Sequence, residues 1–310
     1  MIHVAIGTAY SLGLMKGDIL IAPRTAHFLN SGKCLYDCAY CTRARTSRSK
    51  EVYLCRIPWP AFEEKEVFQA LEDNAEKFQR VCLQVVNSEN HLRFASEYVS
   101  QIQEVSSLPI SVELRTKRLG DVERFLSLGA EYVGLPLDVA SEELFPRIRG
   151  GSLRENLSFL LTAFESFGGR VGTHLIVGLG EKEEEIVHIM REIMRDRISL
   201  GLFAFTPCRG TRMENCPPPQ ISQYRRIQLA RYLISIDRDD SITFDERGRI
   251  SSFGLDQEEI ARIPGSVFET QGCEGCNRPY YNERPVGRPY NYPRRLTDEE
   301  LLTELGGALR

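Results

Sequence analysis

Three cysteines lie close together in the chain, Cys34, Cys38 and Cys41, at C-x3-C-x2-C spacing. Thiolates are the usual protein ligands of a [4Fe-4S] cluster, in which each iron takes one ligand from outside the cube. Three thiolates on one short loop can hold three irons and leave the fourth open to a small molecule. A structural zinc site needs four ligands, usually in two paired knuckles, and no His or Cys follows Cys41 at knuckle spacing. The spacing therefore favours an iron–sulfur cluster with one open iron.

A second cysteine pair, Cys273 and Cys276, stands near the C-terminus at C-x2-C spacing, within the polar and aromatic stretch 272–285. Such a pair suits metal ligation, but the spacing is equally compatible with a redox dithiol or with half of a zinc site. The remaining four cysteines are single, and a single cysteine is often a small buried apolar residue. Nine cysteines without a secretion signal indicate metal or redox chemistry rather than a disulfide framework.

The composition excludes several classes of protein. The 310 residues are 42% hydrophobic, enough for a large core, and the formal net charge of −4 gives no general nucleic-acid footprint. No run of 18 apolar residues is present, so no membrane span is expected. The first residues lack a basic segment and a cleavage site, which predicts a cytoplasmic protein. A basic run (Arg43, Arg45, Arg48 and Lys50) favours a solvated loop, with electrostatic support for the cluster or for an anionic substrate as the alternative.

Strand-like and helix-like segments alternate along most of the chain. The predicted strands are residues 25–31, 80–86, 109–115, 132–137, 170–177, 200–205, 241–244 and 266–268. The predicted helices between them include residues 63–77, 90–105, 119–128, 153–167, 184–195 and 221–234. Eight such units predict an α/β fold, a (β/α)8 TIM-type barrel, with the cluster loop at the C-terminal face of the first strand. We expect a lead-in over residues 1–24, the barrel over residues 25–270 and a C-terminal extension over residues 271–310.

The cluster loop, with Tyr40 before its third cysteine, closely resembles that of the radical S-adenosylmethionine (radical SAM) superfamily. The resemblance implies that Cys34, Cys38 and Cys41 hold a [4Fe-4S] cluster whose open iron binds SAM. An external electron donor then drives reductive cleavage of SAM to a 5′-deoxyadenosyl radical. No side chain is assigned a catalytic role, because the cofactors carry the chemistry.

Three further segments resemble biotin synthase and its relatives: residues 172–181 (GTHLIVGLGE), 132–138 (YVGLPLD) and 205–211 (FTPCRGT). This resemblance implies that Ile176 packs on the SAM adenine and that Asp138 binds the ribose hydroxyls, with Tyr40 also positioning the nucleoside. Biotin synthase holds a second cluster on barrel-strand cysteines. Cys82 matches the second-strand position, but the third strand has no cysteine and Gly172 replaces the fifth-strand one, which argues against biotin synthase itself.

The ending of the chain, with Pro58-Trp59-Pro60 and residues 224–231, resembles the two-protein lipoyl synthases of the biotin-synthase-like group. This implies C–S bond formation at C6 or C8 of an octanoyl chain on a lipoyl carrier protein or domain, with a paralogous partner protein. The sulfur would come from an auxiliary cluster of the [4Fe-4S] type, held by Cys273, Cys276 and, on the biotin-synthase parallel, Cys82. Cys55 is the second choice, and Cys208 and Cys216 lie on loops.

Other functions are also compatible with these motifs. One is a different biotin-synthase-like radical SAM enzyme, a maturase or a methylase. Another is a non-catalytic iron–sulfur or zinc scaffold. An RNA-thiolating enzyme fits poorly with the acidic net charge. The Arg- and Tyr-rich ending is expected to form a lid across the barrel or a docking surface for a carrier protein.

Overall fold

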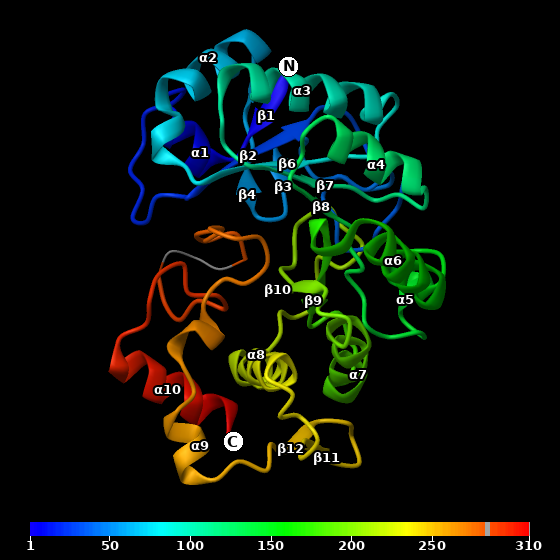
Figure 1. The fold of residues 1–310 in the computed structure, drawn as a ribbon, viewed down its shortest axis with the longest axis vertical. Helices are drawn as coiled ribbons and strands as arrows, with labels where there is room; N and C mark the ends of the chain where they lie inside the picture. Colours follow the sequence, from blue (N-terminus) through cyan, green and yellow to red (C-terminus); the bar gives the residue numbers. More distant parts are fainter. Residues whose placement is uncertain (283–285, 310) are drawn as a thin grey trace.

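A computed structural model describes residues 1–282 and 286–309. Its centre is an eight-stranded sheet in the order β10-β9-β8-β7-β6-β2-β1-β5 (Figure 1). The parallel strands are β2 (Thr25–Asn30), β6 (Arg80–Gln84), β7 (Ile110–Glu113), β8 (Tyr132–Gly134), β9 (Val171–Val177) and β10 (Ser199–Ala204). Two short antiparallel strands, β1 (Ile2–Val4) and β5 (Ala61–Phe62), extend the sheet beyond β2.

Helices cover the outer face of the sheet, as expected for parallel strands joined by crossover connections. The helices are α1 (Ile6–Ser11), α2 (Glu64–Asn74), α3 (His91–Val105), α4 (Leu119–Ser127), α5 (Phe145–Ile148), α6 (Leu153–Phe167), α7 (Glu183–Met194), α8 (Ile221–Ser235), α9 (Gln257–Ala261) and α10 (Asp298–Ala308). Short 3₁₀ turns are η1 (Ala75–Lys77), η2 (Gly168–Arg170) and η3 (Gly265–Phe268). Two hairpins stand apart from the sheet, β3 (Tyr53–Leu54) with β4 (Ile57–Pro58), and β11 (Thr243–Phe244) with β12 (Ile250–Ser252).

Helix α6 shows why these segments form where they do. Its buried residues Leu153, Leu157, Leu160 and Ala163 recur at helical spacing, which gives one apolar stripe facing the sheet. The Ser152 side chain accepts a hydrogen bond from the Glu155 backbone and caps the first turn. None of the described helices is long and apolar enough to cross a membrane.

The α/β barrel-type architecture and six of the predicted strand–helix units are confirmed, whereas the last two units differ. Residues 241–244 contribute β11, whose hairpin partner is β12, because the Asp245 side chain accepts from the Arg247 and Arg249 backbones and turns the chain back. Residues 266–268 lie in the 3₁₀ turn η3 after Pro264. The remaining two sheet strands come instead from β1 and β5, and β10 and β5 form the two edges among the described strands.

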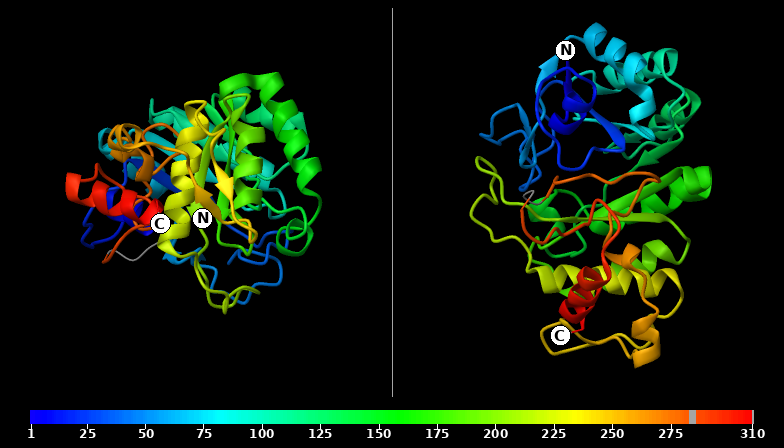
Figure 2. Two further views of the ribbon diagram at one scale, coloured as in Figure 1. Left: turned by 90° about the horizontal axis from the view of Figure 1, so that it is seen from below. Right: turned by 90° about the vertical axis from the view of Figure 1, so that its left-hand side faces the viewer.

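Residues 271–282 of the predicted extension run between β10 and the first strands. Arg278 donates to the carbonyls of Leu202 (3.4 Å) and Gln271 (3.0 Å), which attaches the segment to β10. On the other side, the Arg24 backbone donates to Asn277 (2.8 Å). In the right-hand view of Figure 2 this orange segment lies between the blue N-terminal strands and the yellow α8. The extension therefore lies across the open side of the curved sheet.

A buried ion pair fastens the end of the chain to the barrel. Arg225 of α8 and Glu304 of α10 lie 2.6 Å apart, and neither side chain is exposed. Arg288 and the Tyr292 hydroxyl also donate to Glu304. Residues 283–285, which belong to the predicted cysteine-containing stretch, and residue 310 lie outside the described residues.

Candidate radical SAM active site

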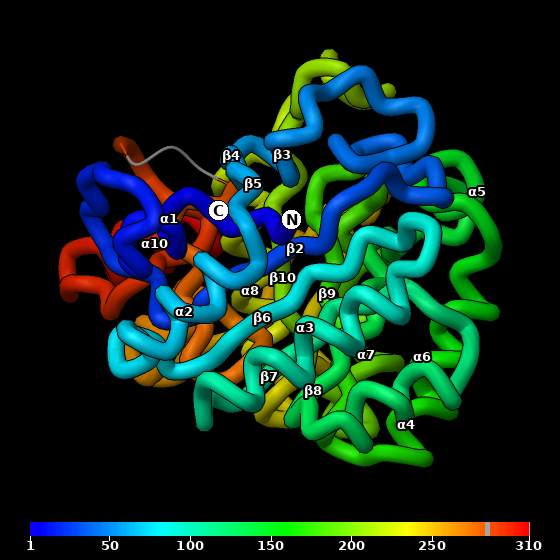
Figure 3. The backbone as a smooth tube through the Cα atoms, turned by 90° about the horizontal axis from the view of Figure 1, so that it is seen from above, coloured from blue at the N-terminus to red at the C-terminus, as the bar shows by residue number. Residues whose placement is uncertain are grey.

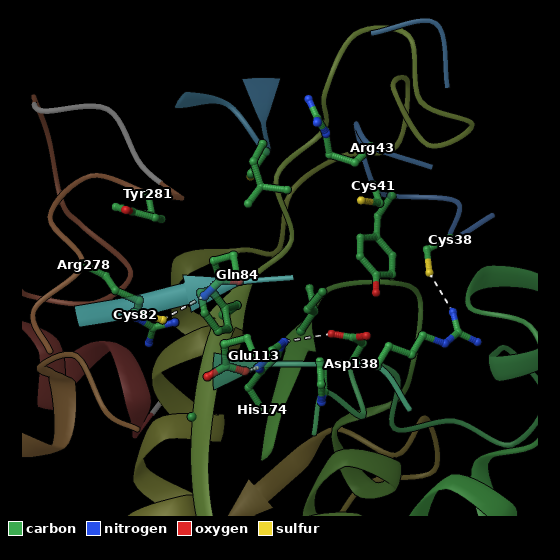
Figure 4. A pocket seen from close by; sticks show the side chains of 18 of the residues that line it. Cys38, Cys41, Arg43, Cys82, Gln84, Glu113, Asp138, His174, Arg278 and Tyr281 are labelled. Carbon is green, nitrogen blue, oxygen red and sulfur yellow. Dashed lines mark hydrogen bonds and ion pairs between the residues drawn. The ribbon is translucent and has the colours of Figure 1, made fainter. Parts of the chain in front are cut away.

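One cavity of about 300 Å³ lies inside the curved sheet. The three loop cysteines line it at the carboxyl ends of the strands, together with Tyr40, Asp138 and Ile176. Cys82, Cys273 and Cys276 line the same cavity. Figure 4 shows Cys38 and Cys41 on one side of the cavity and Cys82 on the other, with Glu113 and His174 between them. The structure thus brings the predicted site residues to a single cavity.

The cluster loop follows β2 and is held by backbone hydrogen bonds. The Cys41 amide donates to the Cys38 carbonyl (3.1 Å), and the Cys34 amide donates to the Arg43 carbonyl (3.0 Å). The Leu35 amide donates to the carbonyl of Asn87, which follows β6 (2.9 Å). These bonds hold the loop in the conformation in which all three cysteines line the cavity.

The three cysteines of this loop are half-buried, and a cationic side chain lies beside them. Arg115, at the end of β7, donates to the Cys38 sulfur (3.2 Å) and stacks on the Tyr36 ring at 3.7 Å. Burial and the neighbouring Asp138 charge raise the pKa of Cys38, and burial together with Cys38 raises that of Cys41. A thiolate at these positions therefore needs a cation to stabilise it, and cluster iron is such a cation.

The donor set fits a [4Fe-4S] cluster with SAM. Within residues 1–282 and 286–309, no group of three His, Cys, Asp or Glu side chains is arranged to hold one metal ion. A [4Fe-4S] cube does not require three side chains around one ion, because each of its thiolate ligands binds a different iron. Beside the loop, the Arg149 Nη1 atom is buried without a hydrogen-bond partner. An anionic group bound in the cavity would satisfy it.

Asp138 lies at the centre of a buried polar network. Arg149 donates to one of its carboxylate oxygens (2.7 Å) and His174 Nε2 lies 2.9 Å from the other. The Tyr40 hydroxyl also bonds to Asp138, and the Ile176 amide donates to the Asp138 carbonyl (2.7 Å). Burial alone would raise the pKa of Asp138, but Arg149 and His174 outweigh it and hold the pKa below its usual value. Tyr40, Asp138 and Ile176 are therefore neighbours, and a ribose would share the Asp138 oxygens with protein donors.

The second group of cysteines forms from distant parts of the sequence. Cys82 lies on β6, while Cys273 and Cys276 lie on the segment that crosses the open side of the sheet. Burial and the charges of Glu113, Cys273 and Cys276 raise the pKa of Cys82. Gln84 donates to the Cys82 sulfur (3.2 Å), and burial raises the pKa of Cys273 to about 12.

Glycine explains how this segment approaches the barrel so closely. A Cβ on Gly201 of β10 would lie 3.3 Å from the Gln271 carbonyl oxygen and 3.7 Å from Gly272. Gly275 has φ +75°, and a Cβ there would lie 2.7 Å from the Gln79 side chain. The absence of a side chain at Gly201 and Gly275 therefore lets the backbone around Cys273 and Cys276 pack closely against β10 and against Gln79, which precedes β6.

The structure also accounts for the missing cysteine at position 172. A Cβ on Gly172 would lie 2.1 Å from the Tyr132 hydroxyl and 2.7 Å from the Ser199 carbonyl oxygen. The space that a fifth-strand cysteine would occupy is taken by Tyr132. The departure from the biotin synthase pattern is thus built into the packing of β8, β9 and β10.

The other three cysteines belong to neither group, although Cys55 lines the same cavity. The Cys208 thiol donates to the Thr206 carbonyl (3.3 Å), and the interaction between Cys55 and Cys208 lowers the pKa of Cys55 and raises that of Cys208. Cys55 lines the cavity near Thr206, and Cys216 packs half-buried against the main core. Within the described part of the chain, no hydrogen bond joins Cys55 to Cys273 or Cys276.

Several polar side chains in the cavity were not predicted: Glu113, Arg115, Arg149, His174 and Arg278. His174 Nδ1 lies 3.7 Å from Glu113, whose pKa is raised by burial against the lowering effect of His174 and Arg278. Arg278 stacks on the Phe203 ring at 3.7 Å. The alternation of side chains along a strand could have predicted His174 as a site residue, because Gly172 and Ile176 lie on the same face of β9. Arg149 and Arg278 lie in irregular segments that have no such period.

Comparisons with known proteins agree with this geometry. The family model for the radical SAM superfamily matches residues 31–193. The crystal structure of methylornithine synthase (PylB) aligns at a TM-score of 0.53 and 15% identity, over 66% of this chain and 59% of that chain. HydG, a maturase of the [FeFe]-hydrogenase, aligns at 0.56 and 11%, over 68% and 50%. HydG from Carboxydothermus hydrogenoformans aligns at 0.54 and 16%, over 69% and 51%.

The alignments thus span between half and three-fifths of those proteins. Because the sequence identities are low, the alignments are evidence for a shared fold and not for a shared function. No curated protein matches the sequence. The family match covers more than half of the chain, and the fold and the three-cysteine loop agree with it. The chain belongs to the radical SAM superfamily, with a TIM-type radical SAM fold.

Proposed function

We propose that this enzyme forms a carbon–sulfur bond on an octanoyl chain, using sulfur from an auxiliary cluster held by Cys82, Cys273 and Cys276. The observation that carries the proposal is that these three cysteines, from β6 and from the C-terminal segment, line the same cavity as Cys34, Cys38 and Cys41. A substrate in this cavity has the radical source on one side and a second thiol trio on the other.

When bound, the [4Fe-4S] cluster with SAM supplies the 5′-deoxyadenosyl radical, and the auxiliary cluster supplies sulfur. The chain binds and orients these groups. Arg115 and Arg149 bring positive charge to the loop cysteines, while Tyr40 and Ile176 shape the place for the nucleoside. A reacting carbon held in this cavity would be partly shielded from water and oxygen by the surrounding side chains.

The wall of the cavity also suits a saturated chain. Apolar side chains from several strands and from the hairpin line it, namely Leu29, Leu54, Val86, Ile176, Phe203 and Phe205. An unactivated methylene or methyl carbon offers no polar handle, so apolar contacts along its length must position it. This supports an octanoyl chain on a lipoyl carrier protein or domain as the substrate.

The test is anaerobic product analysis with an octanoylated carrier peptide, with and without a candidate paralogous partner. We expect thio-octanoyl peptide from the wild type. Cys273→Ala should retain SAM cleavage and lose the thiolated product. Cys216→Ala, which removes a half-buried cysteine that does not line the cavity, is the matched control and should behave as wild type. Thiolated product from Cys273→Ala would show that the auxiliary site is wrongly assigned.

A second candidate function follows from the polar groups in the middle of the cavity. Glu113, His174 and Arg278 would suit a substrate with ionised groups, such as an amino acid, in a maturase-like or related radical reaction. In that case iron and sulfide counts should correspond to one cluster per chain, and octanoyl peptide should not be consumed. SAM-dependent 5′-deoxyadenosine formation separates both candidates from a non-catalytic scaffold.

A further inference from the structure

Strand β2 carries one histidine, His27, whose side chain points into the cavity. His27 is in register with Cys82 of the neighbouring parallel strand β6, and both side chains line the cavity. Figure 3 shows the blue β2 and the cyan β6 running side by side. Adjacent strands of a sheet lie about 5 Å apart, so residues in register on the same face are direct neighbours. The imidazole therefore lies beside the first cysteine of the proposed auxiliary site.

The segment that carries the other two cysteines packs against the same ring. The Tyr281 ring, five residues after Cys276, lies 5.0 Å from the His27 ring between centroids. The Trp59 ring lies 6.4 Å from the His27 ring and meets it edge-on. Figure 4 shows Tyr281 and Arg278 on the same side of the cavity as Cys82. His27 is thus next to the strand that carries one cysteine of the trio and in contact with the segment that carries the other two.

The His27 side chain is buried without a hydrogen-bond partner. It is 2% exposed, and within the described part of the chain its Nδ1 atom bonds to no other group. The Trp59 Nε1 and Tyr281 hydroxyl beside it are also buried and unpartnered. Burial and the Arg278 charge outweigh the Thr25 backbone and lower the pKa of His27 to about 3, so the ring is neutral. A buried polar atom without a partner costs stability, and a neutral imidazole nitrogen is a common metal ligand.

The other polar groups beside the trio are less suitable as ligands of an iron–sulfur cluster. Ser111 pairs with Cys82 on the far side of β6, but it lies outside the described lining of the cavity and its hydroxyl accepts from Arg80 (3.0 Å). Glu113 lines the cavity, but burial raises its pKa, and carboxylate oxygen is a hard ligand. Imidazole, by contrast, is known to replace thiolate on cluster iron, as in Rieske centres. His27 is therefore the side chain best suited to join the three cysteines.

We propose that His27 binds the fourth iron of the auxiliary cluster, which Cys82, Cys273 and Cys276 leave without a protein ligand. The proposal rests on the proposed function, because it takes the auxiliary cluster as given. The bond uses a lone pair of the neutral ring, so no proton is released. Within the described residues no three such side chains surround one point, which argues against a single zinc ion held by His27 and the cysteines. The two sites then differ, since the loop cluster keeps its fourth iron open and the auxiliary cluster does not.

The test isolates the auxiliary cluster and reads its ligands spectroscopically. In the background variant Cys34, Cys38 and Cys41 are changed to alanine, and the full chain, labelled with ¹⁵N-histidine, is reconstituted anaerobically with iron and sulfide. Pulsed electron paramagnetic resonance of the reduced protein should show a histidine nitrogen coupling of the size that direct ligation gives. We expect His27→Ala in this background to lose the coupling. His188→Ala, at an exposed position of α7, is the control and should retain it.

His27→Cys supplies the second readout and replaces His27→Ala if that variant fails to fold. It should keep the cluster, lose the nitrogen coupling and lower the reduction potential, because a thiolate replaces a neutral ligand. A coupling that persists in both variants would belong to another histidine, such as His174, and would overturn the proposal. A cluster without any histidine coupling would also overturn it and leave the proposed function standing. A background variant that takes up no iron would overturn the auxiliary site itself, and with it both the proposed function and this ligand.

Discussion

The buried pair of Asp138 and Arg149 offers the sharpest test of how the site is built. The side chains are 8% and 1% exposed, and their atoms lie 2.7 Å apart. In Asp138→Asn the carboxylate charge disappears while the guanidinium stays buried. The amide oxygen can still accept one hydrogen bond, but the NH₂ group then faces either Arg149, which can only donate, or His174, which accepts at Nε2 only in the tautomer with its proton on Nδ1.

The expected cost is large. Removal of one partner of a buried ion pair costs about 3–5 kcal/mol, because the remaining charge is left without compensation. Domains are stable by only about 5–15 kcal/mol, so the variant should lose about a fifth or more of its stability. A second substitution, Arg149→Met, removes the orphaned cation and should recover part of the loss. The double variant should therefore be more stable than Asp138→Asn, with a coupling energy of about 1 kcal/mol or more.

The pH dependence has a definite sign. The folded-state pKa of Asp138 is depressed, so its contribution is complete above the unfolded-state pKa of about 3.9. It is lost as the pH falls through the folded value. The stability difference between wild type and Asp138→Asn should thus be constant near neutral pH and shrink below about pH 4. Urea unfolding followed by circular dichroism at several pH values measures it. A variant within about 0.5 kcal/mol of wild type at neutral pH would refute the reasoning.

Three further substitutions test other parts of the molecule. Cys38→Ala should abolish both the visible absorption of the catalytic cluster and SAM cleavage after anaerobic reconstitution, and intact cleavage would contradict the ligand assignment. Gly172→Cys should lower stability by about 1–3 kcal/mol through its clash with the Tyr132 hydroxyl and should not raise the iron content. Glu304→Leu should cost about 3–5 kcal/mol, because Arg225 remains buried and unpaired. Limited proteolysis should then cut near α10, and an uncut variant would show that the pair does not fasten the extension.

The sequence predicted the parts of the fold that follow a period. The strands β2, β6, β7, β8, β9 and β10 are short apolar runs between amphipathic helices, so both their existence and their order could be predicted. The last two strands of the barrel were predicted wrongly. Residues 241–244 and 266–268 are segments too short for their sequence pattern to distinguish a sheet strand from a hairpin or a 3₁₀ turn. Two-residue β5 pairs with β1 through contacts that no local pattern encodes.

The candidate site also has a part that the sequence predicts and a part that depends on tertiary packing. The loop of Cys34, Cys38 and Cys41 is local, so spacing alone indicated its chemistry. The proximity of Cys82 to Cys273 depends on how the extension crosses the sheet, and only the resemblance to a family suggested it. The pairing of Asp138 with Arg149 could not be predicted, because Arg149 sits on an irregular segment and its partner is chosen by tertiary packing.

The most direct measurement concerns the source of the sulfur. The enzyme is reconstituted with iron and heavy-isotope sulfide, freed of excess sulfide and given octanoylated carrier peptide, SAM and reductant for a single turnover. The account predicts that the thiolated product from wild type and Cys216→Ala carries the heavy isotope, and that Cys273→Ala cleaves SAM but makes no such product. Thiolated product with light sulfur, or heavy product from Cys273→Ala, would contradict it.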